Sequence, residues 1–544
     1  MPGGLSPAAA PHGRRVARVL AGAVVAAGVL VLALPHALAD WQLVPDAIEY
    51  YAIAHSFASG AGFVDPIAYS HYLEPHYPLP GAAARPPLWP LVLALPLRLG
   101  AAIEDVQVLH VVAAALVGAG VFATAARFAS TPAALAAAIG FAWSFGWSSL
   151  ARLVLTETAS VALVLALVAL APRALRSVRA AAAFGVLAFA AWLTRPNLAL
   201  AVPALALAGA GVDGLRASAR SRPLWTAALV SLGFVAAFWA LHVAATGLAP
   251  YAHHGVLLET LGAEDARFYQ REYVGPLRYF AAHAGEVSAL LRWNARAIAR
   301  TLFLEPGWHY VGWLALPGLA RALVARGPGA AARRFIAWLA LCQLPPTLAV
   351  PGSVEPLRLS LFFALAGWLL AAELFDAVTR ALAARVEGPG RGFAARLRAA
   401  PVALVLAVFA GSPSAAYQLG VAREAWRSYA ARGTRARNAA FVSAAAICPT
   451  LPRGALVASP DPWAIALWCG NPGLWLPVDL DSAELAERYL AEQAPNAVVL
   501  DGDPRYTMLR RSPRLAPLGL AAAGWTGYRV VGPEPPPPAW RPPA

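Results

Sequence analysis

The sequence predicts an α-helical polytopic membrane protein that carries a small α/β domain near its C-terminus. Of the 544 residues, 59% are hydrophobic and only 13% are charged, and the mean hydropathy is +0.56. Apolar runs of roughly 14 to 25 residues recur along most of the chain, and about 20 residues of helix cross a bilayer core. A soluble protein of this length has more charge and shorter apolar runs. We therefore expect about eleven to thirteen transmembrane helices.

The strong positive charge is explained by membrane topology better than by a nucleic-acid surface. The formal net charge is +14, and all 43 basic residues are arginines. Most of them stand in short clusters between apolar runs, as in loops on the cytoplasmic side of a membrane. This placement argues against nucleic acid as a partner. The clusters predicted to be cytoplasmic are 14–18, 173–179, 216–222, 321–334 and 380–398.

The first apolar run is predicted to be a retained transmembrane helix. Basic residues precede it, and Ala37 and Ala39 form a pattern that resembles a signal-peptidase site. The run is about 20 residues long, whereas the apolar part of a signal peptide has roughly 7 to 15. The arginines before it place the N-terminus in the cytoplasm, so this helix ends outside, near Asp40.

Four apolar runs follow an external loop predicted over residues 40–85. An even number of spans would return the chain to the outer side, whereas the arginines after the fourth run indicate the cytoplasm. The run 86–99 has about 14 residues, or roughly 21 Å of helix, so we interpret it as partly interfacial. The other predicted elements are runs 106–126, 131–149 and 152–171, helices 180–193, 197–211 and 399–418, and a second external loop at 246–300.

Composition divides the chain into three parts. Residues 1–419 hold the apolar runs. Residues 420–533 alternate short β-rich segments with a helix predicted at 482–493, which indicates an α/β domain outside the cytoplasm. Residues 534–544 form a proline-rich tail.

Two of the three cysteines, Cys448 and Cys469, fall in the predicted α/β domain. They form a disulfide if this domain faces an oxidising compartment, or they remain two buried thiols, and the sequence leaves both interpretations open. The third, Cys342, lies in an apolar run and is predicted to be inert.

The stretch PDAIEYYAIAHSFASGAGF, residues 45–63, places Asp46 and Glu49 directly after the first apolar run. Its pattern predicts a short helix ended by Gly60 and Gly62, with both carboxylates on one face because they are three residues apart. Such a helix can lie on the membrane surface and hold a carboxylate where lipid meets water. On charge alone, surface carboxylates of a solvated loop are the simpler interpretation.

Further short motifs follow this stretch in a fixed order. Together they cover about residues 15 to 380 and resemble polytopic glycosyltransferases of the GT-C class. The likeness is to bacterial relatives of the dolichyl-phosphate-mannose protein mannosyltransferases and of the aminoarabinose lipid A transferase. The matching text is Asp46, Tyr50–Tyr51, Gly60 and Gly62, Arg85–Pro86–Pro87–Leu88, LTETAS around Glu157, LTRPN around Arg195, and EPLRLSLFFALAGWLLAAEL around Arg358.

This resemblance implies an inverting hexosyl- or pentosyltransferase of the cell envelope, in the plasma or inner membrane. It would take a sugar from a polyprenyl-phosphate donor and transfer it to a lipid, glycan or protein acceptor outside the cytoplasm. Direct inversion requires one general base for the acceptor and positive charge on the departing phosphate. It does not require the acid and nucleophile pair of retaining glycosidases.

The resemblance also suggests roles for individual residues. Asp46 is the expected catalytic base, and Arg85 is expected to neutralise the phosphate with help from Arg195 or Arg358. Glu157 is an intramembrane carboxylate, a costly placement that indicates function. Glu49 and Glu157 are expected to orient the acceptor or to join a metal site. The full set expected to bind substrate is Glu49, Tyr50, Arg85, Glu157, Arg195 and Arg358.

Cofactor use is left undetermined by the sequence. Some relatives carry an acid next to the basic residue before Pro86–Pro87, and this chain has Ala84 there. A divalent metal ion therefore remains open without an assigned ligand set, and the histidines show no metal-ligand spacing.

Three other functions compete with the glycosyltransferase hypothesis. A transporter or flippase of lipid-linked sugars would also be polytopic, although the sequence shows no inverted repeat and its charges gather on one predicted membrane face. A polysaccharide polymerase or lipid-linked ligase would share much of the chemistry. A non-catalytic relative would share the motifs without activity.

Overall fold

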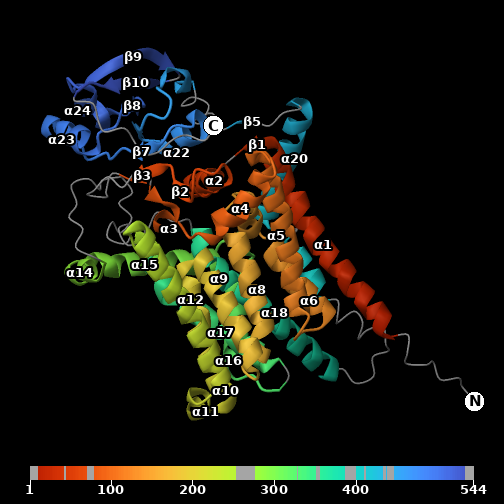
Figure 1. The fold of residues 1–544 in the computed structure, drawn as a ribbon. Coiled ribbons are helices and arrows are strands. Elements are labelled where there is room, and N and C mark those ends of the chain that lie inside the picture. Colours follow the sequence, from red (N-terminus) through yellow and green to blue (C-terminus); the bar gives the residue numbers. More distant parts are fainter. Residues whose placement is uncertain are drawn as a thin grey trace, which may run out of the picture.

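The computed structural model shows a bundle of helices with a small sheet domain at one end (Figure 1). The proline-rich tail 534–544 and residues 253–275 of the predicted second external loop lie outside the described residues. The described residues are 10–41, 44–69, 79–252, 276–327, 329–350, 356–385, 400–409, 412–432, 436–437, 446–522 and 524–532.

The helices of the bundle agree with the predicted apolar runs to within a few residues at several ends. The first helix and the runs 106–126, 152–171 and 180–193 all appear as helices. The bounds are α1 Ala10–Ala39, α2 Pro45–Ala58, α3 Gly81–Ala84, α4 Leu88–Arg98, α5 Ile103–Ala125, α6 Thr131–Ala142, α7 Phe145–Ala151, α8 Glu157–Ala174, α9 Val178–Thr194, α10 Ala201–Asp213, α11 Leu215–Ala219, α12 Arg222–Thr246, α14 Pro276–Ala282, α15 Ala284–Phe303, α16 Gly312–Leu323, α17 Ala330–Leu348, α18 Pro356–Arg385 and α20 Pro413–Arg432.

The protein is a multi-pass membrane protein by the length and composition of its helices. Within the described residues, five helices are long and apolar enough to cross a membrane: α1, α5, α8, α12 and α18. Two bent helix pairs raise this number to seven if each pair is one span, and three shorter apolar helices accompany them. The larger number expected from the sequence, about eleven to thirteen, stays a prediction.

Two predicted single helices are broken in the structure. The run 131–149 divides into α6 and α7, bent by 60°, because Ser144 between them caps α7 by accepting a hydrogen bond from the backbone N–H of Trp147. The last predicted helix, 399–418, is likewise two pieces, Ala400–Phe409 and α20, bent by 66°. Pro413 at the start of α20 has no backbone N–H to continue the preceding helix.

Small residues let the helices pack closely in the centre of the bundle. Alanines fill the buried faces of α6, and Gly140 of the same helix lies against the ring of Trp368 on α18. A Cβ atom on Gly140 would stand 2.4 Å from that ring, so only glycine fits this approach. Between membrane helices, where lipid is as apolar as the side chains, such close packing supplies much of the attraction.

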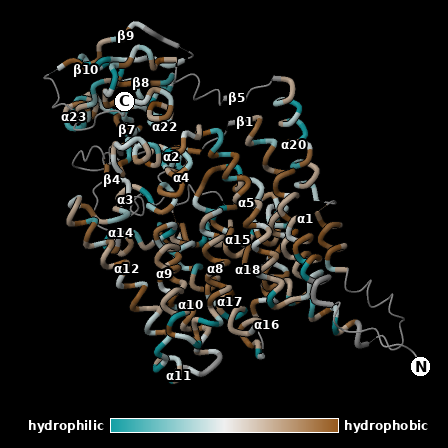
Figure 2. Tube along the Cα trace, turned by 45° about the vertical axis from the view of Figure 1, so that its right-hand side comes forward, coloured by the Kyte–Doolittle hydropathy of each residue, from teal (hydrophilic) through white to brown (hydrophobic). Residues whose placement is uncertain are grey.

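The outer faces of the bundle are apolar. Along α12, Trp225, Leu229, Leu232 and Phe234 are all exposed. Figure 2 shows hydrophobic residues along the bundle helices and more hydrophilic residues in the sheet domain. An exposed apolar helix face of this length suits contact with lipid.

The sheet domain confirms the predicted α/β segment and adds one strand from elsewhere in the chain. Its order is β3-β7-β6-β8-β10-β9, parallel from β3 to β8 and antiparallel from β8 to β9. The predicted helix 482–493 is α23 (Ala483–Gln493), capped by Ser482. The strands are β3 Ile67–Tyr69, β6 Val457–Ser459, β7 Gly473–Trp475, β8 Ala497–Leu500, β9 Leu515–Ala522 and β10 Trp525–Val530.

Strand β3 belongs to the first predicted external loop, 40–85. It pairs with β7 in parallel, so the loop is joined to the sheet by backbone hydrogen bonds. Periodicity did not reveal this pairing, because a three-residue strand carries almost no pattern of its own. The predicted domain boundary at 419/420 falls within α20.

Cys448 and Cys469 form a disulfide across 21 residues of the sheet domain, which decides between the two interpretations left open by the sequence. It joins η4 (Cys448–Thr450) to the end of η5 (Ile465–Cys469). Cys342 is a free thiol on α17.

This assignment predicts the number of reactive thiols. Alkylation of the denatured, unreduced protein is expected to modify Cys342 alone, and alkylation after reduction to modify all three cysteines, as counted by intact mass. Modification of all three without reduction would contradict the disulfide. A Cys342→Ser variant serves as the control, because it should show no alkylation before reduction.

Candidate active site

Helix α2 brings Asp46 and Glu49 to one face, as predicted. Asp46 stands in the first turn, where the helix dipole stabilises a negative charge. Helix α4 packs against α2 and eight residues of α2 are buried, and its predicted position at the membrane surface stays a prediction. Glu49 is fully buried, whereas 26% of the Asp46 side chain is exposed.

Arg85 binds both carboxylates of α2. It follows the short helix α3, and its Nη2 donates to Asp46 Oδ1 at 2.9 Å and to Glu49 Oε2 at 2.6 Å. The guanidinium also lies 5.8 Å from the ring centre of Tyr50, within reach of a cation–π contact. Burial raises the pKa of the Tyr50 phenol to about 12, so it remains neutral at physiological pH.

The second half of the site comes from three other helices. Glu157 opens α8 and is fully buried, and Arg358 of α18 donates from Nε to Glu157 Oε1 at 2.8 Å. The Nη1 of Arg358 donates to Asp46 Oδ2 at 2.9 Å. Arg195, between α9 and η2 (Pro196–Leu200), lies with Nη2 3.4 Å from Glu157 Oε1. Arg358 thus connects Glu157 to α2.

Carboxylates and guanidiniums therefore alternate in one continuous chain, here called the ion-pair network. Its order is Glu49, Arg85, Asp46, Arg358, Glu157 and Arg195. Together with Tyr50, these are all the residues that the sequence predicted for the site, and the structure brings them together. Their catalytic and binding roles stay predictions.

The network lies at the end of the bundle that faces the sheet domain. Figure 1 shows α2 and α3 between the transmembrane helices and the sheet. Helix α2 also contacts α22 (Pro462–Ala464) and η5 of the sheet domain. The site therefore lies where the transmembrane helices, the first loop and the sheet domain meet.

Asp65 belongs to the site and was not predicted. It is fully buried on β2 (Val64–Asp65), and its Oδ1 accepts a hydrogen bond from the backbone N–H of Ile67 at 2.9 Å. Burial raises the pKa of Asp65 well above its ordinary value, and the adjacent Glu49 carboxylate raises it further through repulsion and a hydrogen bond. The raised pKa favours the protonated form of Asp65, which can share its proton with the Glu49 carboxylate. The sequence offered one signal, an acid before Pro66, which is common in turns.

Metal binding does not fit the residues that are present. Among the described residues, no group of three or more His, Cys, Asp or Glu side chains is placed to hold a metal ion. Asp46, Glu49 and Glu157 instead contact guanidinium groups. We therefore derive no chemical step through a metal.

The sequence matches no protein-family model and no curated protein. The structure is similar to the archaeal oligosaccharyltransferase AglB from Archaeoglobus fulgidus in complex with an inhibitory peptide and a dolichol-phosphate, with a TM-score of 0.54, 13% identity, and coverage of 89% of this chain and 69% of that chain. It is also similar to ArnT from Cupriavidus metallidurans in the apo state, with a TM-score of 0.53, 15% identity, and coverage of 96% and 100%. It is likewise similar to ArnT from Cupriavidus metallidurans bound to undecaprenyl phosphate, with a TM-score of 0.53, 14% identity, and coverage of 97% of this chain and 100% of that chain.

The chain has the GT-C fold. The predicted fold class, a helical membrane bundle with a small C-terminal α/β domain, is confirmed. At identities of 13 to 15%, the similarity establishes the GT-C fold alone. The activity has to be argued from the residues of the ion-pair network.

One prediction concerns the charge balance within the ion-pair network. Glu157→Gln leaves Arg195 and Arg358 without their shared carboxylate, and breaking a buried ion pair costs about 3–5 kcal/mol. We expect a lower melting temperature in detergent. The double variant Glu157→Gln/Arg195→Gln removes one positive charge as well and is expected to recover part of the loss. Additive losses in the double variant would show that Arg195 and Glu157 are not coupled.

Another prediction concerns the protonation of Asp65. Because its pKa is raised in the folded protein, its stabilising contribution is fully present below the ordinary carboxyl pKa of about 3.9 and is lost as pH rises toward the raised value. Asn at this position keeps a donor for Glu49 and an acceptor for Ile67 but does not titrate. The melting temperature should therefore fall less between pH 5 and pH 8 in Asp65→Asn than in wild type, by on the order of 2 °C.

The opposite result has a clear meaning for Asp65. If Asp65→Asn loses more stability at pH 8 than at pH 5, the side chain is ionised in the folded protein and paired with a cation. Asp105→Asn is the matched control, since Asp105 lies at the start of α5 and accepts a hydrogen bond from the backbone N–H of Ala102.

Proposed function

We propose that this protein is an inverting glycosyltransferase that moves a sugar from a polyprenyl-phosphate donor to a lipid, glycan or protein acceptor. One observation carries the proposal. Of the three carboxylates in the ion-pair network, Asp46 alone is substantially exposed, at 26% of its side chain, and two arginines hold it from opposite oxygens. A substrate can reach this carboxylate, whereas Glu49 and Glu157 are fully buried.

The acceptor is activated by Asp46 in this proposal. A hydroxyl or amine of the acceptor gives its proton to the Asp46 carboxylate as its oxygen or nitrogen bonds to the anomeric carbon of the sugar. The bond between that carbon and the phosphate oxygen breaks on the opposite face, so the configuration inverts. The electron pair of the broken bond leaves with the polyprenyl phosphate.

The leaving phosphate is stabilised by arginine. Arg85, Arg195 and Arg358 have side chains that are 10, 21 and 16% exposed, so each presents part of its guanidinium to the site. Guanidinium binds phosphate through paired hydrogen bonds. When the phosphate draws Arg85 or Arg358 toward itself, Asp46 loses a positive neighbour and becomes a stronger base.

The buried carboxylates hold the arginines in place. Glu49 holds Arg85, and Glu157 holds Arg195 and Arg358. Without a substrate, the three arginines balance the three ionised carboxylates. The phosphate of an arriving donor adds negative charge to the site. The arginines then interact with this phosphate as well as with Asp46.

The structural neighbours support the kind of partner. One is ArnT with bound undecaprenyl phosphate, and another is AglB with a dolichol-phosphate and an inhibitory peptide. Both ligands are phosphorylated polyprenols, which is the chemistry that the arginines of the network suit. The identity of the sugar and of the acceptor does not follow from this similarity.

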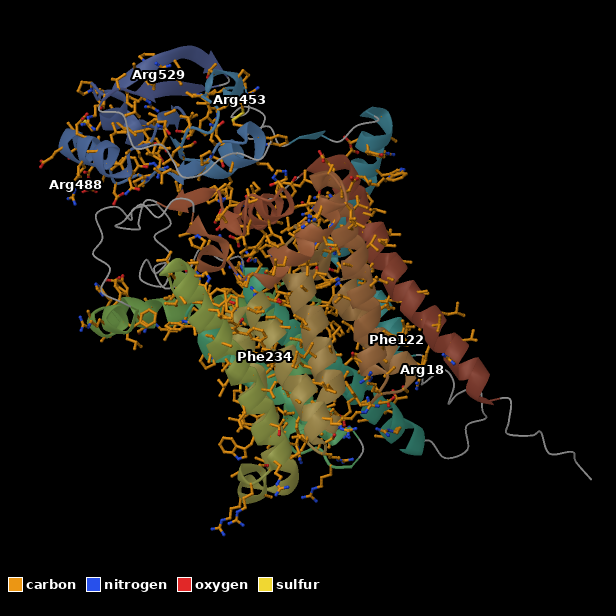
Figure 3. The ribbon with its side chains drawn as sticks, viewed as in Figure 1. Arg18, Phe122, Phe234, Arg453, Arg488 and Arg529 are labelled. Carbon is orange, nitrogen blue, oxygen red and sulfur yellow. A yellow bond between two sulfur atoms is a disulfide. The ribbon has the colours of Figure 1, made fainter. Side chains whose placement is uncertain are left out.

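We also propose that the site faces away from the cytoplasm of the plasma or inner membrane. Arg18 lies at the end of α1 distant from the sheet domain, whereas Arg453, Arg488 and Arg529 lie on the sheet domain (Figure 3). The arginine clusters at the distant end mark it as cytoplasmic by the positive-inside rule. The disulfide of the sheet domain suits an oxidising compartment. Residues 1–419, 420–533 and 534–544 stay the proposed transmembrane domain, extracytoplasmic domain and tail.

Transfer of radiolabelled sugar from polyprenyl-phosphate donors to membrane extracts tests the function. Asp46→Asn keeps the shape but removes the base, so transfer should fall on the order of 10²-fold or more. Asp105→Asn should transfer as wild type does. A wild-type protein that transfers nothing across the donor panel would overturn the proposal in favour of a transporter. An Asp46→Asn variant as active as wild type would assign the base elsewhere.

A further inference from the structure

A polar pocket is formed by α1, α7 and α20. Its cavity volume is about 20 Å³, and it is partly open to the surroundings. Its polar wall consists of His36, Ser148, Ser149, Arg152 and Gln418. None of these residues belongs to the ion-pair network, so the pocket is a separate feature of the protein.

The pocket presents positive charge and hydrogen-bond donors. Arg152 donates from Nη1 to His36 Nδ1 at 3.1 Å, which holds the guanidinium at the wall. Ser148 and Ser149 add hydroxyl groups, and no acidic side chain is among the described residues that line the pocket. An anion with several oxygens matches this set of groups.

Gln418 gives independent evidence for a ligand. Only 5% of its surface is exposed, and its Oε1 accepts a hydrogen bond from Ser148 Oγ at 2.7 Å. Its Nε2, buried at the pocket, meets no hydrogen-bond acceptor among the described residues. A buried amide N–H without an acceptor costs about 1–3 kcal/mol, so a ligand oxygen in the pocket would relieve that cost.

The depth of the pocket in the membrane suits a lipid head group. His36 is 21 residues beyond Arg15 along α1, or roughly 32 Å of helix, which is close to the thickness of the hydrocarbon core. The helix faces around the pocket expose apolar side chains, including Val31, Tyr417 and Leu419. Acyl chains can lie along these faces while a head group occupies the polar pocket.

The pocket is connected to the ion-pair network through residues 151–155, between α7 and α8. Side chains of α4 and α5 hold this segment by its carbonyls: Gln107 donates to Arg152 O, Trp89 to Val154 O, and His110 contacts Ala151 O and Leu155 O. Two residues further on, Glu157 binds Arg358. The segment that carries Arg152 therefore also positions a carboxylate of the candidate active site.

We propose that this pocket binds the phosphate group of an anionic membrane phospholipid from the outer leaflet. The phosphate oxygens accept from Arg152, from the Ser149 hydroxyl and from Gln418 Nε2, and the acyl chains pack on α1 and α20. The site is distinct from the proposed donor site and does not depend on the transferase activity.

Lipid binding by the purified full-length protein tests the proposal. Native mass spectrometry would measure retention of phosphatidylglycerol, with phosphatidylcholine as the zwitterionic comparison. Arg152→Gln removes the positive charge, and Gln418→Glu places a negative charge in the pocket with almost no change of shape. Each is expected to weaken phosphatidylglycerol binding about tenfold or more. Arg127→Gln is the control, because it removes an arginine that lies outside the pocket and binds the Ala169 carbonyl.

The source of the phosphate is separated by a second arm with inorganic phosphate alone. Thermal stabilisation of wild type by phosphatidylglycerol but not by millimolar phosphate supports a lipid site. Equal stabilisation by free phosphate would overturn the lipid assignment. Phosphatidylglycerol binding that is unchanged in both Arg152→Gln and Gln418→Glu would overturn the site itself. If Arg152→Gln does not fold, Gln418→Glu alone decides between these outcomes.

Discussion

The structure around the candidate site depends on charge compensation in a poorly solvated place. Three carboxylates and three guanidiniums alternate from Glu49 to Arg195, and two of the carboxylates have no contact with solvent. Removing one member leaves a buried charge without its partner, which costs more than the pair contributes. The same constraint raises the pKa of Asp65, because burial and the neighbouring Glu49 carboxylate disfavour another negative charge there.

This constraint also joins distant parts of the chain. Its members come from the first loop, from α8, from the residue before η2 and from α18, so the network joins four segments that are distant in the sequence. The loop then continues past Asp65 into β3, the edge strand of the C-terminal sheet. Asp65, beside Glu49, lies two residues before Ile67, where β3 begins. A change at Glu49 or Asp65 can therefore reach the sheet domain through this short stretch of backbone.

Much of the architecture was predictable because it follows from local pattern. Long apolar runs gave α1, α5 and α8, and the Asp46–Glu49 spacing gave one helical face. Local pattern also predicted the helix after Ser482 and the buried strand that follows it. The breaks at Ser144 and Pro413 were not recognised, because apolar composition continues on both sides of each bend. The partnership of β3 with β7 was beyond any local signal, since their pairing spans some 400 residues of sequence.

The sequence by itself determined which chemical groups the predicted site contains, because its motifs can be recognised without a structure. These motifs lie around Asp46, Arg85, Glu157, Arg195 and Arg358. Tertiary structure decided which atom binds which. It left Asp46 accessible and buried Glu49, brought Asp65 against Glu49, and gave Arg358 two partners at once. The physical reason is that ionisation and reactivity depend on solvent access and on neighbours within a few ångströms. Those neighbours stand up to 312 positions apart in the chain.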